Sequence, residues 1–206
     1  MSEAVPTVFL VDDDAAVLKG LGRLLAAVGM SVLAFDSPRR FLDGFDPAAA
    51  GCLVLDVAMP EFDGLELQQE LAALDCDLPI IFLTGHGDIP TSVRAVKRGA
   101  ADFLTKPVDD EVLLAAIRHA FDRNAEVRRS HEARTAVEKR LATLSSREHE
   151  VLERVATGRL NKQIAAELGL VEKTVKVHRA HVMNKMGART LAELLSLAEL
   201  AGIRIG

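Results

Sequence analysis

The sequence has no tryptophan and no tyrosine among its 206 residues, so its core must come from aliphatic side chains and eight phenylalanines. Its two cysteines, Cys52 and Cys76, are too few for a disulfide framework, and we expect buried free thiols because both lie in apolar stretches. No apolar run approaches the roughly 18–20 residues that span a bilayer. Residues 1–6 lack the basic start and apolar stretch of a signal peptide. These absences exclude membrane, collagen-like, disulfide-rich secreted and zinc-finger classes, and they predict a cytoplasmic globular protein without a membrane partner.

The net charge of −5 conceals a difference between the two halves of the chain. Residues 1–122 carry 20 Asp and Glu against 9 Lys and Arg, a net charge of −11, whereas residues 123–206 carry 10 against 16, a net charge of +6. Opposite charges indicate two domains with different partners, a cation for the acidic half and nucleic acid for the basic half. The alternative is that the two halves are solvated surfaces whose charges differ by chance. The motifs in each half are needed to distinguish these two interpretations.

The first half alternates short apolar runs with segments of helical periodicity. The runs have the length of strands and lie at residues 7–11, 31–35, 52–55, 80–83 and 101–104. Nearly continuous apolar strands, each followed by a helix, are typical of a parallel sheet that is buried on both faces. The pattern therefore predicts an α/β fold, a doubly wound five-stranded parallel sheet. A strand order of 2-1-3-4-5 would bring the carboxyl ends of four of these strands to one edge.

Polar residues follow four of these runs, where an open parallel sheet binds its ligands. They are the triplet from Asp12 to Asp14, then Asp56, Thr84 and Lys106. Each is ordinary alone, and Asp14 has the position of a helix N-cap. Together they form a chemical set: clustered carboxylates call for a cation such as Mg²⁺. An Asp can attack phosphorus, and Thr and Lys can bind the phosphoryl oxygens.

The motifs in this half resemble the receiver domain of two-component response regulators over residues 6–122, which has a flavodoxin-like fold. They are Val11-Asp12-Asp13-Asp14, Leu55-Asp56-Val57-Ala58-Met59-Pro60, Asp63-Gly64, Leu83-Thr84-Gly85-His86-Gly87-Asp88 and Lys106-Pro107. The resemblance implies that Asp56 accepts phosphate from a sensor histidine kinase.

The same resemblance assigns roles to the residues around Asp56. It implies that Mg²⁺ is held by Asp12, Asp13, Asp56 and the backbone carbonyl of Ala58, with Asp12 acting directly or through water. Thr84 and Lys106 would sense the phosphoryl group, Phe103 would be the switch aromatic, and Lys106–Pro107 is a candidate cis peptide. Ala58 departs from the family because related regulators often have a polar residue there, which leaves the lifetime of the phosphate open.

The second half predicts a small all-α domain behind a charged linker. Residues 123–143 contain no glycine or proline, which favours an exposed helix that continues the fifth helix of the first domain. Residues 144–206 contain the capping boxes Ser145-Ser146-Arg147-Glu148 and Thr190-Leu191-Ala192-Glu193. Between them, helices at residues 162–168 and 172–186 flank the turn Gly169-Leu170-Val171. This arrangement is a helix-turn-helix.

The second of these helices has two faces at 100° per residue. One face contains Val175, His178, Val182 and Met186, which predicts that it packs on the core and that His178 is a hydrogen-bonded core residue rather than a metal ligand. The opposite face contains Lys173, Lys176, Val177, Ala180 and Asn184. A solvated face is the alternative, but in a basic helix-turn-helix these residue types suit a DNA major groove.

This half resembles the LuxR-type DNA-binding domain over residues 141–203, and the whole chain is similar to response regulators of the FixJ/NarL type. The resemblance rests on residues 144–148, 158–165 and 173–178, and residues 84–88 favour FixJ. It implies DNA contacts from Asn161, Lys162, Lys173, Thr174, Lys176, Val177 and Lys185. Val171 stands where relatives often have a Ser N-cap, a loss of about 1 kcal/mol of helix stability. Ala180 replaces a base-contacting Lys of some relatives.

The sequence therefore predicts a transcription factor that binds DNA when it is phosphorylated. Its expected partners are a sensor histidine kinase, paired half-sites in double-stranded DNA and a second copy of the chain after phosphorylation; RNA polymerase is a further partner that this function allows. A constitutive DNA-binding regulator that uses its receiver only for dimerisation is the alternative. An aspartyl-phosphate enzyme is disfavoured, because Ala58 supplies no acid–base group and no substrate domain remains, so we expect no outside substrate.

Overall fold

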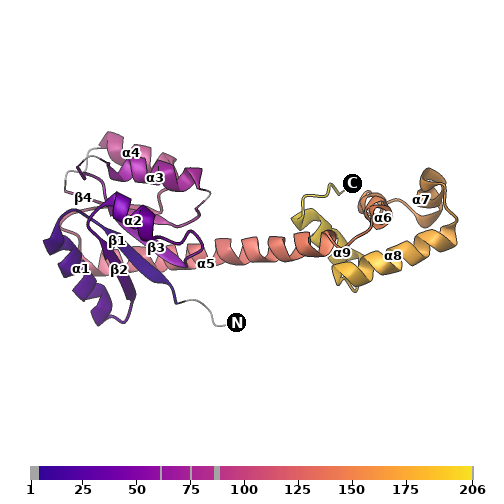
Figure 1. Cartoon of the computed structure of the whole chain (residues 1–206), viewed down its shortest axis with the longest axis horizontal. Coiled ribbons are helices and arrows are strands. Elements are labelled where there is room, and N and C mark those ends of the chain that lie inside the picture. The colour runs from indigo at the N-terminus through magenta and orange to yellow at the C-terminus, as the bar shows by residue number, and fades with distance from the viewer. Residues whose placement is uncertain (1–4, 61, 75, 86–88, 206) are drawn as a thin grey trace. The chain divides into compact units, whose positions relative to one another are not determined.

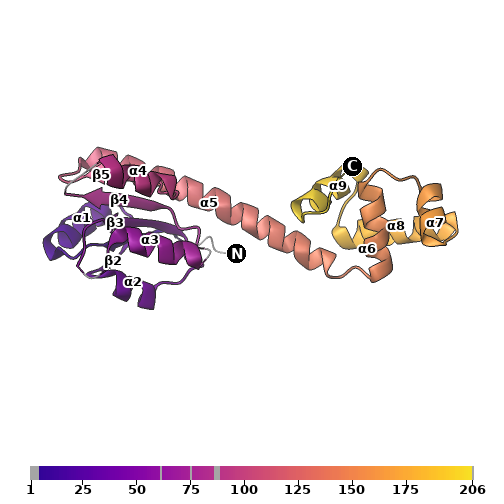
Figure 2. The same cartoon turned by 90° about the horizontal axis from the view of Figure 1, so that it is seen from above.

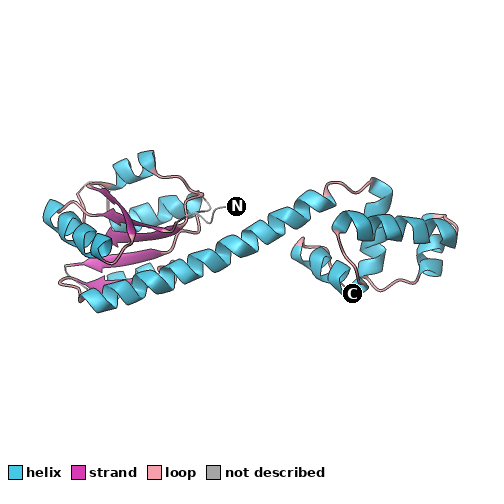
Figure 3. Ribbon diagram, turned by 90° about the horizontal axis from the view of Figure 1, so that it is seen from below, coloured by secondary structure: helices cyan, strands magenta, loops and turns pink. Residues whose placement is uncertain are grey.

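The computed structural model describes residues 5–60, 62–74, 76–85 and 89–205. The chain divides into two compact units, Met1–Arg128 and Arg129–Gly206. Figure 1 shows strands and helices in the first unit, and Figure 3 shows helices without strands in the described part of the second. In the described part of the chain, no helix combines the length and the apolar character needed to cross a bilayer.

The described strands of the first unit form the predicted parallel sheet, and their order β2-β1-β3-β4-β5 is the one that brings the polar strand ends to one edge. The strands are β1 (Thr7–Val11), β2 (Ser31–Phe35), β3 (Gly51–Asp56), β4 (Ile80–Thr84) and β5 (Asp102–Thr105). Every residue of β3 and β4 is buried, which explains their continuous apolar sequences, because helices cover both faces. The pairs Asp56–Leu83 and Thr84–Thr105 lie in register, so the carboxyl ends of the strands meet at one edge.

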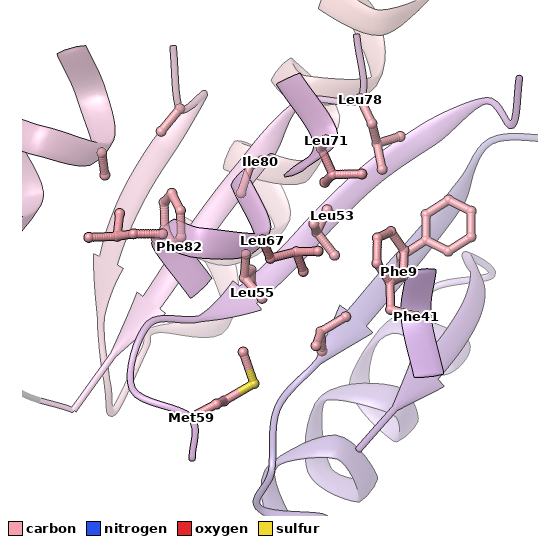
Figure 4. Packing of buried hydrophobic residues seen from close by; sticks show 14 residues of the cluster. Phe9, Phe41, Leu53, Leu55, Met59, Leu67, Leu71, Leu78, Ile80 and Phe82 are labelled. Atoms are coloured by element: carbon pink, nitrogen blue, oxygen red, sulfur yellow. The ribbon is translucent and has the colours of Figure 1, made fainter. Parts of the chain in front are cut away.

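Two apolar clusters fill the spaces between the sheet and its helices. The helices are α1 (Ala15–Ala27), α2 (Pro38–Gly44), α3 (Gly64–Ala73), α4 (Ile89–Lys97) and α5 (Asp110–Leu141). Alternate residues of β1 point to opposite faces: Phe9 packs in the cluster that contains residues of α2, α3 and α4, and Val8 packs in the cluster that contains residues of α1 and α5. Figure 4 shows the first cluster, in which Phe9 and Phe41 lie edge to face with ring centroids 5.8 Å apart.

Helix α5 is anchored to the loops at the amino ends of the strands. The buried amide of Asn124 accepts a hydrogen bond from the Gly51 backbone N–H (3.1 Å) and donates one to the Asp77 carbonyl (3.4 Å). Arg128 donates a further hydrogen bond to the carbonyl of Ala48. These contacts hold the segment that the sequence marked only as a charged, exposed helix.

The second unit contains α6 (Ser146–Ala156), α7 (Asn161–Leu168), α8 (Glu172–Met186) and α9 (Leu191–Leu200), which Figure 2 labels. Its core is apolar and includes Val175, Val182 and Met186, the buried face of α8 that the periodicity predicted. Gly169 ends α7 in the left-handed conformation (φ 64°), which only glycine adopts without strain and which makes the tight turn of the helix-turn-helix.

The helix starts of this unit agree with the sequence in part. Ser145 and Glu148 form the predicted capping box of α6. At α9, Thr190 accepts the Glu193 N–H (3.1 Å), but the Glu193 carboxylate bonds the N–H of Arg189 instead of Thr190, so the predicted second box is incomplete.

Candidate functional site

An acidic site lies at the carboxyl edge of the sheet, where three strands deliver its residues. Asp12 follows β1, Asp56 ends β3, and both are buried. Lys106 follows β5, and its Nζ lies 2.6 Å from Asp12 Oδ2 and 2.6 Å from Asp56 Oδ1. One ammonium therefore holds two carboxylates that would otherwise repel each other.

Backbone groups fix the orientation of both carboxylates. The Ala58 N–H donates to Asp56 Oδ2 (2.9 Å), and the Asp14 N–H donates to Asp12 Oδ1 (2.9 Å). Asp14 is also the N-cap of α1, where its side chain accepts the N–H of Ala16 (2.7 Å). Asp13, which follows Asp12 in the chain, is exposed.

Charge is unfavourable on one member of this site. Burial raises the pKa of Asp56 above its ordinary value; Lys106 opposes that rise, and the nearby charge of Asp12 adds to it. Burial also opposes the charge of Lys106, but its hydrogen bonds to Asp12 and Asp56 outweigh burial and raise the pKa of Lys106. A site with crowded carboxylates and all-oxygen ligands fits Mg²⁺, which keeps several waters and favours phosphoryl oxygens.

The remaining receiver positions lie next to the acidic site. Thr84 is buried at the end of β4, and its carbonyl accepts the N–H of Lys106 (2.7 Å), which places the lysine. The Lys106–Pro107 peptide is cis. Phe103, on the neighbouring strand β5, lies against Phe82 with ring centroids 6.1 Å apart. The motif residues His86, Gly87 and Asp88 lie outside the described residues.

The structure also explains Gly64, which the motif contained without a reason. A Cβ on Gly64 would lie 2.3 Å from the carbonyl oxygen of Asp56, so a side chain there would displace the strand end that carries the acidic site. The Gly64 N–H donates to the Val57 carbonyl (3.0 Å), which closes the loop after Asp56. Its signal in the sequence was the Asp63-Gly64 motif, and in the structure Asp63 is the N-cap of α3.

In the second unit, α8 presents an exposed face opposite its core face. Lys173, Lys176 and Val177 are exposed, with Val177 at 47%, and Thr174 is half-buried. Lys176 makes an exposed ion pair with Glu172 at 3.4 Å, the kind of contact that contributes little and is readily exchanged.

The predicted DNA-contacting residues on α7 and at the end of α8 differ in whether their side chains are engaged in hydrogen bonds within the unit. Lys162 is exposed. Asn161 accepts a hydrogen bond from Arg179 (2.8 Å), which ties the start of α7 to α8. Lys185 donates to the Glu148 carboxylate (2.6 Å) and to the Thr143 carbonyl (3.0 Å), so its ammonium is engaged within the unit. The resemblance implied a DNA contact for Lys185, and nothing near it in the sequence indicates its partner Glu148, which is 37 residues away.

His178 differs from the sequence expectation in two respects. It is half-buried rather than buried like Val175, Val182 and Met186 on the same face, and its Nδ1 has no hydrogen-bond partner among the described residues. The ring therefore does not have the full hydrogen bonding expected of a packed core histidine.

Both halves of the chain match known families. The family "Response regulator receiver domain" matches residues 8–118, and "Bacterial regulatory proteins, luxR family" matches residues 142–198. The chain is 49% identical to Nodulation protein W of Bradyrhizobium diazoefficiens over 196 residues, which are 95% of this chain and 86% of that protein. It is 48% identical to the transcriptional regulatory protein FixJ of Azorhizobium caulinodans, over 98% of this chain and 96% of that protein. Among solved structures, response regulator StyR has a TM-score of 0.86 at 47% identity, over 95% of this chain and 99% of that one.

Proposed function

Because the chain belongs to the response regulators that join a receiver domain to a LuxR-type DNA-binding domain, we propose that phosphorylation of Asp56 switches its binding to DNA. In this proposal residues 1–122 accept the phosphoryl group, residues 123–143 connect the domains, and residues 144–206 bind DNA. The observation that carries it is Lys106, whose ammonium lies 2.6 Å from both Asp12 and Asp56.

The acidic site has the groups that phosphoryl transfer requires. An oxygen of Asp56 attacks the phosphorus of a phosphohistidine on the sensor kinase, the bond to the kinase imidazole breaks, and an acyl phosphate forms. Asp12, Asp13, Asp56 and the Ala58 carbonyl would hold Mg²⁺, which supplies positive charge for the phosphoryl oxygens when it is bound. Lys106 is positioned to take a further oxygen. The chain modifies itself in this scheme and acts on no outside substrate.

Phosphorylation then changes the surface next to the site. The new group adds about −1.5 to −2 charge, and its oxygens offer Thr84 a further acceptor, which favours the conformer in which the Thr84 side chain points toward the site that Lys106 already occupies. Phe103 follows Thr84, and the surface of α4 and β5 is remodelled. Val93 and Val96 on α4 are 43% and 57% exposed, apolar side chains that a second copy of the chain could cover.

A dimer would place two copies of α8 on DNA at half-sites about one helical turn apart. Lys176 and Val177 would read base edges, and Lys162 and Lys173 would bind phosphates, with Asn161 and Thr174 next to them. Lys185 stands apart, because its ammonium holds Glu148, and we assign it to the fold. Joining two weak sites can raise apparent affinity by about 10²–10⁴.

Selection of bound DNA from a random pool, with and without acetyl phosphate and Mg²⁺, tests both domains at once. We expect paired half-sites to be enriched only with the phosphodonor, and we expect the Asp56→Asn protein to enrich none in either condition. Equal enrichment in all arms would establish the constitutive alternative.

Light scattering should show a dimer of the phosphorylated wild type but not of Thr84→Ala. Tight DNA binding by a phosphorylated monomer would exclude dimerisation as the switch.

A further inference from the structure

Three metal-ligand side chains meet in the second unit, outside the residues that we assign to DNA contact. Glu148 on α6 and His178 and His181 on α8 each offer one ligand atom, and these atoms lie within 4.8 Å of one another. The two histidines are three residues apart on one helix, so their side chains are neighbours on its surface. The proposed function uses neither histidine.

One oxygen of Glu148 is occupied by hydrogen bonds, and the other lies near His181. Oε2 accepts hydrogen bonds from Lys185 Nζ (2.6 Å) and from the Ser145 N–H (2.8 Å). Oε1 lies 3.5 Å from His181 Nδ1, beyond the usual 2.7–3.2 Å of an N–H···O hydrogen bond. Two ligands that each lie about 2.0–2.1 Å from one tetrahedral Zn²⁺ are about 3.3 Å apart. Oε1 and Nδ1 are therefore spaced as two ligands of one ion.

The hydrogen bonding of the ligand atoms also suits a metal. Nδ1 of His178 is buried and has no hydrogen-bond partner among the residues that the structure describes, and such an orphaned atom calls for an explanation such as an ion. A neutral imidazole presents one unprotonated nitrogen to a metal, and an unbonded ring nitrogen leaves the tautomer free to adapt. The hydrogen bonds from Lys185 and the Ser145 amide occupy Oε2 of Glu148, which leaves Oε1 as the oxygen available to an ion.

We propose that Glu148, His178 and His181 bind a first-row divalent transition metal, with Zn²⁺ as the best fit. Two imidazoles and one carboxylate are a ligand set that Zn²⁺ uses when a fourth position stays open. Mg²⁺, which takes oxygen ligands, does not suit the site. Lys185 keeps Oε2, so Glu148 binds through Oε1, and the lysine charge moderates the affinity. Because the ligands come from α6 and α8, the ion joins the two helices and stabilises the folded unit.

The test is calorimetric titration of Zn²⁺ into the full chain. Excess Mg²⁺ is present throughout to occupy the all-oxygen site of the first unit. His181→Ala is the informative variant, because the side chain is 59% exposed and its loss leaves the core intact. His131→Ala, which removes an exposed histidine of α5 outside the cluster, is the matched control. We expect one Zn²⁺ per chain in the wild type and the control, and affinity at least about tenfold weaker in His181→Ala.

A second measurement keeps the test independent of variant folding. On addition of Zn²⁺ to the wild type, the ring resonances of His178 and His181 should shift while those of His131 stay in place, and the thermal midpoint of the second unit should rise. Equal Zn²⁺ affinity in wild type and His181→Ala would overturn the proposal. So would a wild type that binds no Zn²⁺ below about 1 mM, or ring shifts confined to other histidines.

Discussion

Each unit of this protein places a lysine ammonium 2.6 Å from a buried carboxylate, yet the two carboxylates respond in opposite ways. The pKa of Asp56 is raised, whereas the pKa of Glu148 is lowered to about 2. Asp56 shares Lys106 with Asp12 and is dominated by burial. Among the described residues, Lys185 pairs with no carboxylate other than Glu148. Glu148 also accepts a hydrogen bond from the Ser145 N–H.

The opposite pKa shifts distinguish a carboxylate that is suited to reaction, Asp56, from one that stabilises the fold, Glu148. At the acidic site, the ionised state is crowded, so an arriving cation or phosphoryl group relieves repulsion and can change the conformation. At Glu148, Lys185 and the Ser145 amide satisfy Oε2, so the ion pair stabilises the position of α6. The role of an ion pair, reactive or structural, can therefore be inferred only when every charged and hydrogen-bonding neighbour of the pair is considered.

The largest effect should come from removing the reactive carboxylate. Asp56→Asn should abolish phosphorylation by acetyl phosphate and Mg²⁺, because the amide cannot form the acyl phosphate. Mass spectrometry of the intact protein measures the added group. Asp36→Asn, which changes an exposed carboxylate that pairs with Arg40, should be phosphorylated like the wild type. Stable labelling of Asp56→Asn would assign the site elsewhere.

The next prediction separates lysines that are free for DNA from the lysine that holds Glu148. Lys176→Ala should lower DNA affinity by about 1–3 kcal/mol and relax preference at one base pair, because a base contact is lost. Lys162→Ala should weaken all sequences alike and reduce the salt slope by about one unit, because it removes a phosphate contact. Binding curves over a salt series distinguish the two. An unchanged preference in Lys176→Ala would remove it from the reading surface.

The supporting carboxylate should affect stability instead of phosphorylation. Glu148→Gln should lower the free energy of unfolding of the second unit by about 2 kcal/mol, because charge-assisted hydrogen bonds to Lys185 and Ser145 are weakened. Chemical denaturation followed by circular dichroism provides the value. Phosphorylation should match the wild type, and Glu150→Gln, at a partly exposed carboxylate on the same helix, should be nearly neutral. If Glu148→Gln left the free energy of unfolding unchanged, the structural role that we assign to Glu148 would be wrong.

The smallest expected effect is a gain in stability, in contrast to the loss expected for Glu148→Gln. Since the pKa of Asp56 is raised by folding, its ionised form destabilises the first unit at neutral pH, and this cost disappears as the pH falls and the carboxyl group takes up a proton. Asp56→Asn should therefore raise the thermal midpoint slightly at neutral pH without Mg²⁺. The gain should vanish in acid, where the wild-type carboxyl is also neutral. A lower midpoint at neutral pH would show that the bond to Lys106 outweighs burial.

Much of the fold could be predicted because it depends on local patterns. The apolar runs predicted the parallel sheet. The strand order 2-1-3-4-5 would gather the polar strand ends, and in the structure it brings Asp12, Asp56 and Lys106 together. Helix periodicity separated Val175 and Val182 from the exposed face of α8. These features follow from spacing, which a sequence displays directly.

The missed features are contacts between residues far apart in the chain. Lys185 looked like another surface cation because nothing near it in sequence marks Glu148 as its partner. Asn124 looked like part of a solvated helix, although its amide bonds Gly51, 73 residues away. The Thr190 box failed at a local level, because Glu193 had a competing N–H at Arg189. Side-chain hydrogen bonds have several local partners of similar energy, and packing decides among them.

The bonds of Asn124 and Arg128 bear on how such chains can be recombined. A chimera that exchanges the output domain at residue 122 would discard both side chains and leave the Gly51 N–H and the carbonyls of Ala48 and Asp77 without these partners. An unsatisfied buried amide costs about 1–3 kcal/mol, so the recipient domain would be weakened at the amino ends of its strands. A crossover after Arg128 keeps these bonds, and the natural exchange of such domains should favour junctions beyond that residue.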